Sequence, residues 1–142
     1  MIRNKYLWLL LVIVLLGFFS NCKKNEVEKI ATTVNDNFES GSIGDVVEIS
    51  ENEWVLFLAN DNGNTDLPVT WRNWWYVKME NITTSTKIKI TLKNRGWPFY
   101  YLPVYSYDQK EWHRFTEEEV SQNEDNELVI NKQFDNDFVW VA

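Results

Sequence analysis

The segment Thr86-Lys87-Ile88-Lys89-Ile90-Thr91-Leu92-Lys93 alternates between apolar and polar side chains. In an extended chain Ile88, Ile90 and Leu92 share one face, whereas the lysines and Thr91 share the other. A period of two residues is typical of a strand that buries one face and leaves the other in water. This segment therefore indicates a β-sheet protein.

Several other segments carry strand patterns. Residues 73–80 predict a strand with Trp75, Val77 and Met79 on its inner face, and residues 53–59 are apolar on both faces, as in a central strand. The remaining candidate strands bring the total to about eight, and they are residues 45–49, 99–107, 111–115, 127–132 and 138–141.

Turn-forming residues such as Gly41, Gly44 and Asn62-Gly63 separate these segments, and sustained helical periodicity is missing after the N-terminal segment. The fold class predicted is therefore all-β, a single antiparallel β-sandwich of about eight strands after an N-terminal signal segment. The acidic run Glu117-Glu118-Glu119 is predicted to be a solvated loop.

The N-terminus resembles a secretory signal. Arg3 and Lys5 precede an unbroken apolar run, residues 7–19, and Cys22, the single cysteine of the chain, follows shortly after it. A helix that spans a bilayer needs about 20 apolar residues, so the run is typical of a signal peptide. A cysteine at this place resembles a bacterial lipoprotein cleavage site, where the thiol is acylated and becomes the new N-terminus. An uncleaved anchor and ordinary cleavage remain alternatives.

This pattern sets the expected domain boundaries. Residues 1–21 are predicted to be a lipoprotein-type signal peptide, residues 22–34 a polar tether, and residues 35–142 one folded domain. Cys22 is the predicted lipid attachment residue, and two acyl chains would anchor the protein stably to a membrane. The expected location is the bacterial cell envelope, and the lack of an Asp directly after Cys22 favours the outer membrane.

The charge balance bears on the partners. The chain has 21 acidic and 14 basic residues, and its net charge is −7. Nucleic-acid binding depends on a basic face that neutralises phosphates, so no nucleic-acid partner is expected. The single cysteine cannot form a disulfide within the chain, so stability must come from the hydrophobic core.

Several short motifs follow one another in an order that resembles a known family. The longest, residues 103–114, fits the pattern P-V-x-S-x-D-x-x-x-W-x-R. Together the motifs resemble the β-sandwich that precedes the peptidase domain in zinc carboxypeptidases of the cytosolic, deglutamylating type. Ser42 stands where the family's opening motif usually has Asn. The other motifs are Phe38-Glu39-Ser40-Gly41-Ser42-Ile43-Gly44, Trp74-Trp75-Tyr76-Val77, Leu92-Lys93-Asn94 and Val139-Trp140-Val141-Ala142.

The resemblance implies a small sandwich packed beside a zinc carboxypeptidase domain, which lies in the same chain in relatives. In the family that domain removes C-terminal residues, often acidic ones, and holds zinc through an H-x-x-E pair and a later His. This sequence contains no H-x-x-E, and its single His113 is followed by Arg-Phe-Thr. No catalytic residue is therefore carried over, and neither enzymatic activity nor a cofactor is expected. A truncated gene and an isolated accessory domain both fit a chain of this extent.

Aromatic residues are the candidates for a contact face. Trp97, Tyr100, Tyr101 and Trp112 are the side chains selected, because the stretch from Trp97 to Tyr101 is the densest aromatic cluster. In a strand about half of such side chains point outward, where they can anchor a protein interface or stack on sugar rings. Core packing, contact with a peptidase domain and a glycan site are the three interpretations left open.

Two further polar features favour structural roles. His113 is predicted to be an ordinary strand residue, because a catalytic zinc site needs three protein ligands, and Arg114 is expected to pair with a carboxylate. Residues 61–66 are rich in oxygen ligands, but they lack the spacing of an EF-hand loop, so a turn is favoured over a calcium site.

These observations lead to one functional hypothesis and one alternative. The chain is predicted to be a non-catalytic accessory domain, anchored to a membrane by lipid, which packs on a zinc carboxypeptidase domain or positions substrate for it. The alternative is a free-standing surface lipoprotein whose β-sandwich binds carbohydrate or protein.

Overall fold

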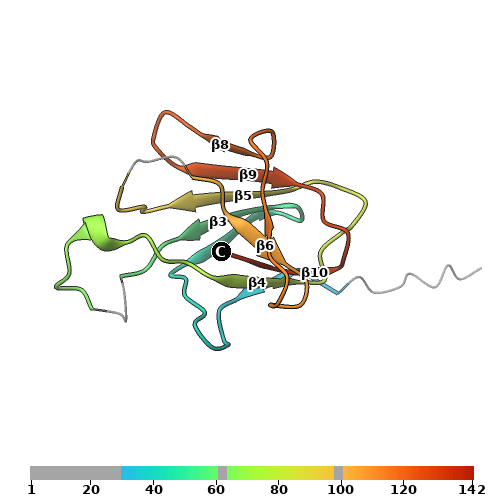
Figure 1. The fold of residues 1–142 in the computed structure, drawn as a ribbon, viewed down its shortest axis with the longest axis horizontal. Coiled ribbons are helices and arrows are strands. Elements are labelled where there is room, and N and C mark those ends of the chain that lie inside the picture. Colours follow the sequence, from blue (N-terminus) through green and yellow to red (C-terminus); the bar gives the residue numbers. More distant parts are fainter. Residues whose placement is uncertain (1–29, 61–63, 98–100) are drawn as a thin grey trace, which may run out of the picture.

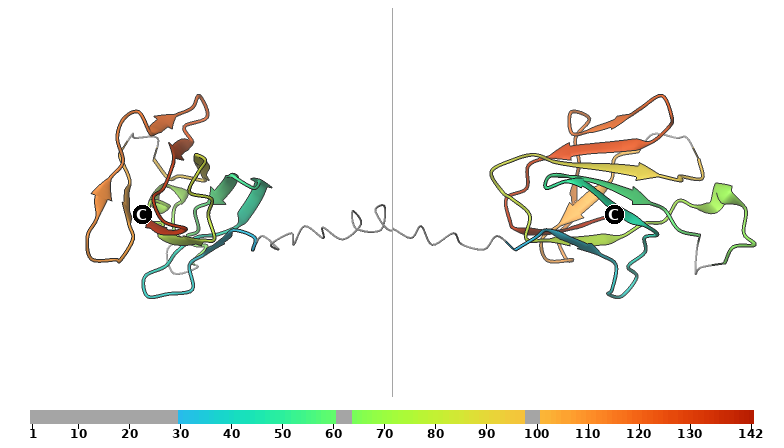
Figure 2. Two further views of the ribbon diagram at one scale, coloured as in Figure 1. Left: turned by 90° about the vertical axis from the view of Figure 1, so that its right-hand side faces the viewer. Right: turned by 180° about the vertical axis from the view of Figure 1, so that it is seen from behind.

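The computed structural model describes residues 30–60, 64–97 and 101–142, and it shows two sheets of five strands packed face to face (Figures 1 and 2). In spatial order the first sheet contains β1 (Thr33–Asn35), β4 (Val77–Glu80), β10 (Phe138–Val141), β6 (Val104–Ser106) and β7 (His113–Arg114). The second sheet contains β2 (Val46–Ser50), β3 (Glu53–Phe57), β5 (Ile88–Lys93), β9 (Leu128–Lys132) and β8 (Val120–Gln122). The predicted all-β sandwich is confirmed.

The core lies between the two sheets and contains the inner faces that alternation predicts. Ile88, Ile90 and Leu92 of β5 are fully buried, and Trp75, Val77 and Met79 of the β4 segment pack against them from the other sheet. Burial of a Leu or Ile side chain stabilises the fold by about 1.5–3 kcal/mol. The other residues of the buried core cluster are Trp54, Leu56, Leu58, Ile82, Phe115, Val120, Leu128, Ile130, Phe134, Val139 and Val141.

One strand pair departs from the antiparallel pattern. β3 and β5 run parallel, with Trp54 opposite Ile90 and Leu56 opposite Leu92, whereas the other strand pairs of the described residues are antiparallel. Parallel neighbours need a crossover connection, and here the chain crosses to the first sheet and returns through β4. As a result β3 and β5 end at the same end of the sandwich (Figure 1).

Two short strands lie outside the segments in which strands were predicted. β1 pairs with β4 and includes Thr33 and Val34, the last two residues of the predicted tether. β8 pairs with β9 directly after the acidic run. The expectation of a fully solvated loop is wrong for Glu119, which is half-buried and ion-paired to Lys132. Short polar strands such as these depend on their partner strands more than on intrinsic propensity.

Some predictions fall on residues that the structure does not describe. The signal peptide and Cys22 lie outside the described residues, as do the first part of the oxygen-rich turn and the start of the strand predicted at residues 99–107. Within the described part, that strand begins at Val104.

The two ends of the described chain lie at opposite ends of the sandwich. Thr33 of β1 is opposite Glu80, the last residue of β4, and Val141 of β10 is opposite Val77, the first residue of β4. Both strands are antiparallel to β4. The chain therefore enters the first sheet beside the end of β4 and leaves it beside the start of β4.

Candidate contact surfaces

The end of the sandwich at which β3 and β5 finish and β4 and β6 begin is called here the loop end. It carries η2 (Val69–Trp71), a short 3-10 helix in the connection from β3 to β4 (Figure 1). Val69, Trp71, Trp74 and Trp97 are each more than half exposed. Single exposed apolar residues are common, but a contiguous group of large ones often marks an interaction surface.

Backbone contacts hold the two connections of the loop end together. The Gly96 amide donates to the Arg72 carbonyl oxygen at 2.8 Å. A Cβ on Gly96 would lie 2.3 Å from the Thr70 carbonyl oxygen, so only glycine allows this approach. Trp71 and Trp97 therefore project from neighbouring, mutually fixed loops.

Tyr101 also lies at the loop end, but it packs inward. The indole Nε1 of buried Trp75 donates to the Tyr101 hydroxyl oxygen at 3.1 Å, and the Arg95 guanidinium lies 5.1 Å from the centre of the Tyr101 ring. Tyr101 is half-buried against the core cluster. The side chain of Tyr101 thus supports the loop end more than it forms the outer surface, and Tyr100 lies outside the described residues.

Trp112 belongs to a second aromatic group on the outer face of the first sheet. Its ring lies 5.7 Å from the ring of Tyr76, between centroids. Phe38 and Trp74 contact the same Tyr76 ring at 4.7 and 6.5 Å. We call these four residues the Tyr76 cluster. The predicted contact face is therefore divided between Trp97 at the loop end and Trp112 in the Tyr76 cluster.

The polar members of the motif at residues 103–114 build the loop that presents Trp112. The buried Ser106 hydroxyl oxygen accepts hydrogen bonds from the amides of Asp108 and Gln109, at 3.2 and 2.9 Å. The Asp108 carboxylate accepts from the Glu111 and Lys110 amides, both at 2.8 Å, and these bonds lower the pKa of Asp108. The motif is thus a set of loop-forming contacts.

The same loop is tied to the sheet beneath it. Gln109 Nε2 donates to the Tyr76 hydroxyl oxygen at 2.8 Å. Arg114 Nη1 donates to the Leu102 carbonyl oxygen at 3.1 Å, so the contact seen for this guanidinium is to backbone rather than to the carboxylate expected from sequence. The result is a fixed position for Trp112 over the outer face of the sheet.

His113 is an exposed residue of β7, as predicted, and its ring lies 5.3 Å from that of Tyr105. Across residues 30–60, 64–97 and 101–142, no group of three or more His, Cys, Asp or Glu side chains could hold a metal ion. In the same residues no helix is long and apolar enough to cross a bilayer.

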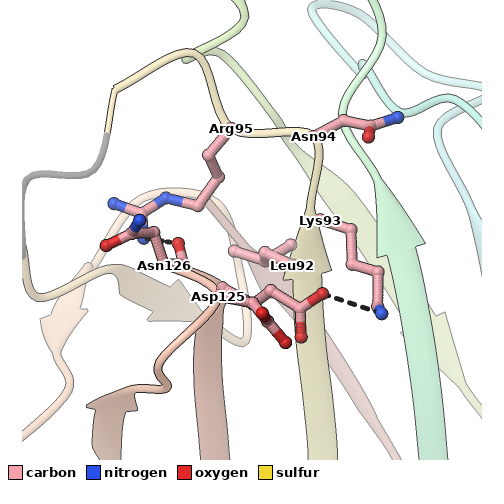
Figure 3. A pocket seen from close by; sticks show the side chains of 7 residues that line it. Leu92, Lys93, Asn94, Arg95, Asp125 and Asn126 are labelled. Atoms are coloured by element: carbon pink, nitrogen blue, oxygen red, sulfur yellow. Dashed lines mark hydrogen bonds and ion pairs between the residues drawn. The ribbon is translucent and has the colours of Figure 1, made fainter.

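A polar pocket of about 390 Å³ lies where β5 ends beside the β8–β9 turn (Figure 3). Its basic groups are already engaged, since Lys93 Nζ lies 2.7 Å from Glu127 Oε1 and Arg95 Nη1 donates to the Asn126 carbonyl oxygen. These contacts join β5 to the β8–β9 turn, so the pocket wall is held by internal bonds. The lining residues are Leu92, Lys93, Asn94, Arg95, Asp125, Asn126 and Glu127.

Trp71 and Trp74 were not among the candidate contact residues selected from the sequence. The alternation of inward and outward side chains along a strand could have identified Trp74. Trp75 was assigned to the inner face of its strand, so Trp74 had to point outward. Trp71 carries no such signal, because it lies in a connection whose path depends on the contact between Gly96 and Thr70.

The fold and its surfaces define the class of protein: a small β-sandwich domain that exposes several tryptophans. The family follows from comparison with known proteins. The model of the cytosolic carboxypeptidase N-terminal domain matches residues 34–142, and the chain belongs to that family.

Solved structures share the fold. A metallo-carboxypeptidase from Burkholderia cenocepacia has a TM-score of 0.62 and 19% identity, over 78% of this chain and 28% of that one. A metallo-carboxypeptidase from Pseudomonas aeruginosa has a TM-score of 0.57 and 20% identity, over 78% of this chain and 28% of that one. The chain thus spans less than a third of the length of these enzymes. None of the curated proteins compared with the chain matches it.

Proposed function

We propose that this chain is a non-catalytic accessory domain whose loop end packs against a metallocarboxypeptidase domain. Membership of the N-terminal domain family supports the proposal, as does the presence of the same fold inside much longer carboxypeptidase chains. The observation that carries the proposal is that exposed tryptophans lie at the loop end, which is also the end of the sandwich at which β10 finishes.

The position of β10 explains why the loop end is the favoured surface. Ala142 pairs with Val104 through two backbone hydrogen bonds, of 3.0 and 2.9 Å, at the end where β6 begins. A domain joined after β10 would leave the sandwich at this end and would meet Trp71, Trp74 and Trp97 first. Tryptophan is enriched among residues that dominate binding energy, because it combines a large apolar area with few rotatable bonds.

The lipid anchor is the second part of the proposal. Acylation of Cys22 would hold the protein at the cell envelope, and the described chain enters the sandwich through Ile30 and β1, at the end opposite the loop end. A peptidase partner bound at the loop end would therefore lie on the side away from the membrane. Electrophoretic mobility and metabolic labelling with a palmitate analogue test the anchor, and a Cys22→Ser variant that keeps the label would contradict it.

A binding module for carbohydrate or protein is the second candidate, and the Tyr76 cluster favours it. Trp74 and Trp112 are both exposed and both lie beside the ring of Tyr76, on the outer face of a sheet. Aromatic side chains on such a face can contact sugar rings. Trp74 belongs to both surfaces, but Trp112 belongs to this one alone, so substitution of Trp112 separates the two candidates.

The test is titration of the full chain, in detergent micelles, with the isolated peptidase domain of the Burkholderia cenocepacia metallo-carboxypeptidase. Tryptophan fluorescence and calorimetry are expected to report a complex. The Trp71→Ala/Trp97→Ala variant should weaken it at least tenfold, which corresponds to about 1.4 kcal/mol. Trp112→Ala is the matched control and should leave the affinity unchanged.

Two outcomes would count against the accessory role. One is a lack of detectable binding at about 100 μM. At that concentration a complex with a binding free energy near −5.5 kcal/mol would be about half formed. The other is equal weakening by Trp112→Ala and by the loop-end variant. Retardation of the protein in polysaccharide gels that Trp112→Ala alone abolishes would establish the carbohydrate-binding alternative instead.

A further inference from the structure

The backbone of Arg72 lies between the two connections that carry the exposed tryptophans of the loop end. Arg72 follows Trp71 directly, and its carbonyl oxygen accepts the hydrogen bond of the Gly96 amide, which precedes Trp97. The Arg72 amide itself donates to the Val69 carbonyl oxygen at 3.2 Å. Both backbone groups of Arg72 are therefore bonded, and its position among the tryptophans is fixed.

The side chain of Arg72 is half-buried and is held by a neutral partner. Its Nε donates to Asn60 Oδ1 at 2.5 Å, and Asn60 lies shortly after the end of β3. Within residues 30–60, 64–97 and 101–142, the Nη1 and Nη2 groups of Arg72 make no hydrogen bond, and Arg72 makes no ion pair. One hydrogen bond thus orients the guanidinium and leaves its outer N–H groups for another acceptor.

Two other cations of the loop end already have partners. Lys93 is paired with a carboxylate, and the Arg95 guanidinium lies 5.1 Å from the centre of the Tyr101 ring. Lys87 lies at the opposite end of the sandwich, directly before β5, and is exposed to water. Arg72 differs from these three cations because it is half-buried beside a neutral amide.

This setting of Arg72 restricts what can cover the loop end. A partner that contacts the tryptophans of both connections would also cover the residue between them. Removal of a guanidinium from water is strongly unfavourable unless a counter-charge accompanies it, and the Asn60 amide carries no charge. The covering surface must therefore supply a carboxylate, whose two oxygens accept parallel N–H bonds from the end of a guanidinium.

We propose that Arg72 pairs with an Asp or Glu side chain of the metallocarboxypeptidase domain, within an apolar surface that contacts the tryptophans. The inference rests on the proposed accessory role and specifies the chemistry of the partner's surface. The Nη1 and Nη2 groups would donate to the carboxylate while Nε keeps its bond to Asn60. A partner surface that is basic or wholly apolar at this point would be disfavoured.

The experiment measures the affinity of the full chain, in detergent micelles, for the isolated peptidase domain of the Burkholderia cenocepacia metallo-carboxypeptidase. Arg72→Gln should weaken the complex about tenfold, because it leaves the partner's carboxylate covered and unpaired. Arg72→Glu should weaken it further, because it places two like charges together. Lys87→Gln and Lys87→Glu make the same changes of charge at the opposite end of the sandwich and should leave the affinity unchanged.

Loss of the bond to Asn60 would also disturb the loop end, so the role of charge is separated from that of structure. Arg72→Gln and Arg72→Glu both lose the Arg72 bond, and a purely structural role predicts equal affinities for the two variants. Arg72→Lys provides a direct measurement, because it introduces an amine that carbodiimide couples to a neighbouring carboxylate. Mass spectrometry should then identify an amide link between position 72 and an acidic residue of the peptidase domain. Circular dichroism establishes that the variants are folded.

The outcomes distinguish failure of the pairing from failure of the accessory role. If no complex forms, or if Trp71→Ala/Trp97→Ala binds as the unmodified chain does, the accessory role is overturned, and the pairing with it. If the tryptophan variant weakens the complex but Arg72→Glu binds as well as Lys87→Glu, only the pairing is overturned. A complex of Arg72→Lys that yields no amide link at position 72 leads to the same conclusion.

Discussion

Lys132 Nζ lies 2.6 Å from Glu119 Oε1 and 4.7 Å from the centre of the Tyr105 ring. The ion pair joins β9 to the turn before β8, and both side chains are largely buried. Burial alone would raise the pKa of Glu119, but hydrogen bonds from Lys132 and from the Thr116 amide outweigh it, so the pKa is lowered. For Lys132, burial opposes the charged form, and the bond to Glu119 nevertheless raises its pKa.

The pair is predicted to stabilise the fold over a defined pH range. A lowered carboxyl pKa contributes stability above the ordinary value of 4.5, and this contribution is lost as the pH falls through the folded-state pKa. The raised Lys132 pKa contributes fully below 10.5 and is lost above it. Glu119→Gln should therefore lower the free energy of unfolding by about 1–3 kcal/mol at pH 7, and by less at pH 3.

Urea denaturation at the two pH values measures this difference. Glu118→Gln removes a carboxylate from the exposed part of the same acidic run and should change the free energy by less than about 0.5 kcal/mol at either pH. A Glu119→Gln effect that is the same at pH 3 and pH 7 would show that the charge pair is not its cause.

The core strand β5 provides a second prediction. Ile90 is fully buried between the sheets, so Ile90→Ala should lower the free energy of unfolding by about 2–5 kcal/mol through lost contacts and a cavity. Lys89, the preceding residue, points outward and pairs with Glu53 at 2.8 Å. Because surface ion pairs contribute at most about 1 kcal/mol, Lys89→Ala should have a much smaller effect. Comparable losses in the two variants, measured by urea denaturation, would contradict the assignment of faces.

The strands with strong local signals could be predicted from the sequence, and the others could not. Alternation in β5 fixed which residues lie inside, but it also assigned Thr91 to the wet face, where Thr91 is only 7% exposed. Val55 and Val129 flank Thr91 on the neighbouring strands and cover it. Such cover, like the parallel pairing of β3 with β5, depends on contacts between distant segments, which no local pattern records.

The β6–β7 loop gives the third prediction. Ser106→Ala removes the hydroxyl oxygen that accepts hydrogen bonds from the Asp108 and Gln109 amides, so both N–H groups lose this acceptor. The free energy of unfolding should fall by about 1–3 kcal/mol. Because Gln109 is bonded to Tyr76, the nuclear magnetic resonance signal of the Trp112 indole should also shift. Ser121→Ala, on exposed β8, should alter neither quantity, and an unchanged Trp112 signal in Ser106→Ala would show that the loop is held by other contacts.

The candidate contact surfaces also depend on contacts between distant segments, so the sequence alone could predict them only in part. Trp97 and Trp112 were selected because they are aromatic, and both are exposed, but their separation into two surfaces follows from the path of the chain. The position of Arg72 carried no signal in the sequence, because its contacts with Asn60 and Gly96 join segments that lie apart in the chain.

Gly96 tests whether the two connections of the loop end act as one unit. Its amide is bonded to the Arg72 carbonyl oxygen, and an added Cβ would lie 2.3 Å from the Thr70 carbonyl oxygen. Gly96→Ala must therefore push the connections apart, and we expect a loss of about 1–3 kcal/mol in the free energy of unfolding. Affinity for a peptidase domain should fall as well, because Trp71 and Trp97 would no longer keep their relative position.

The atom that an added Cβ on Gly96 would clash with is the backbone carbonyl oxygen of Thr70, not its side chain. Since the clash is with backbone, shortening the side chain in a Gly96→Ala/Thr70→Gly double variant should not restore stability. Ser85→Ala, in an exposed turn, is the control for the measurement and should stay within about 0.5 kcal/mol of the unmodified chain. If Gly96→Ala is as stable as the unmodified chain and binds the peptidase domain equally well, the contact between the connections is not what holds the two tryptophans in place.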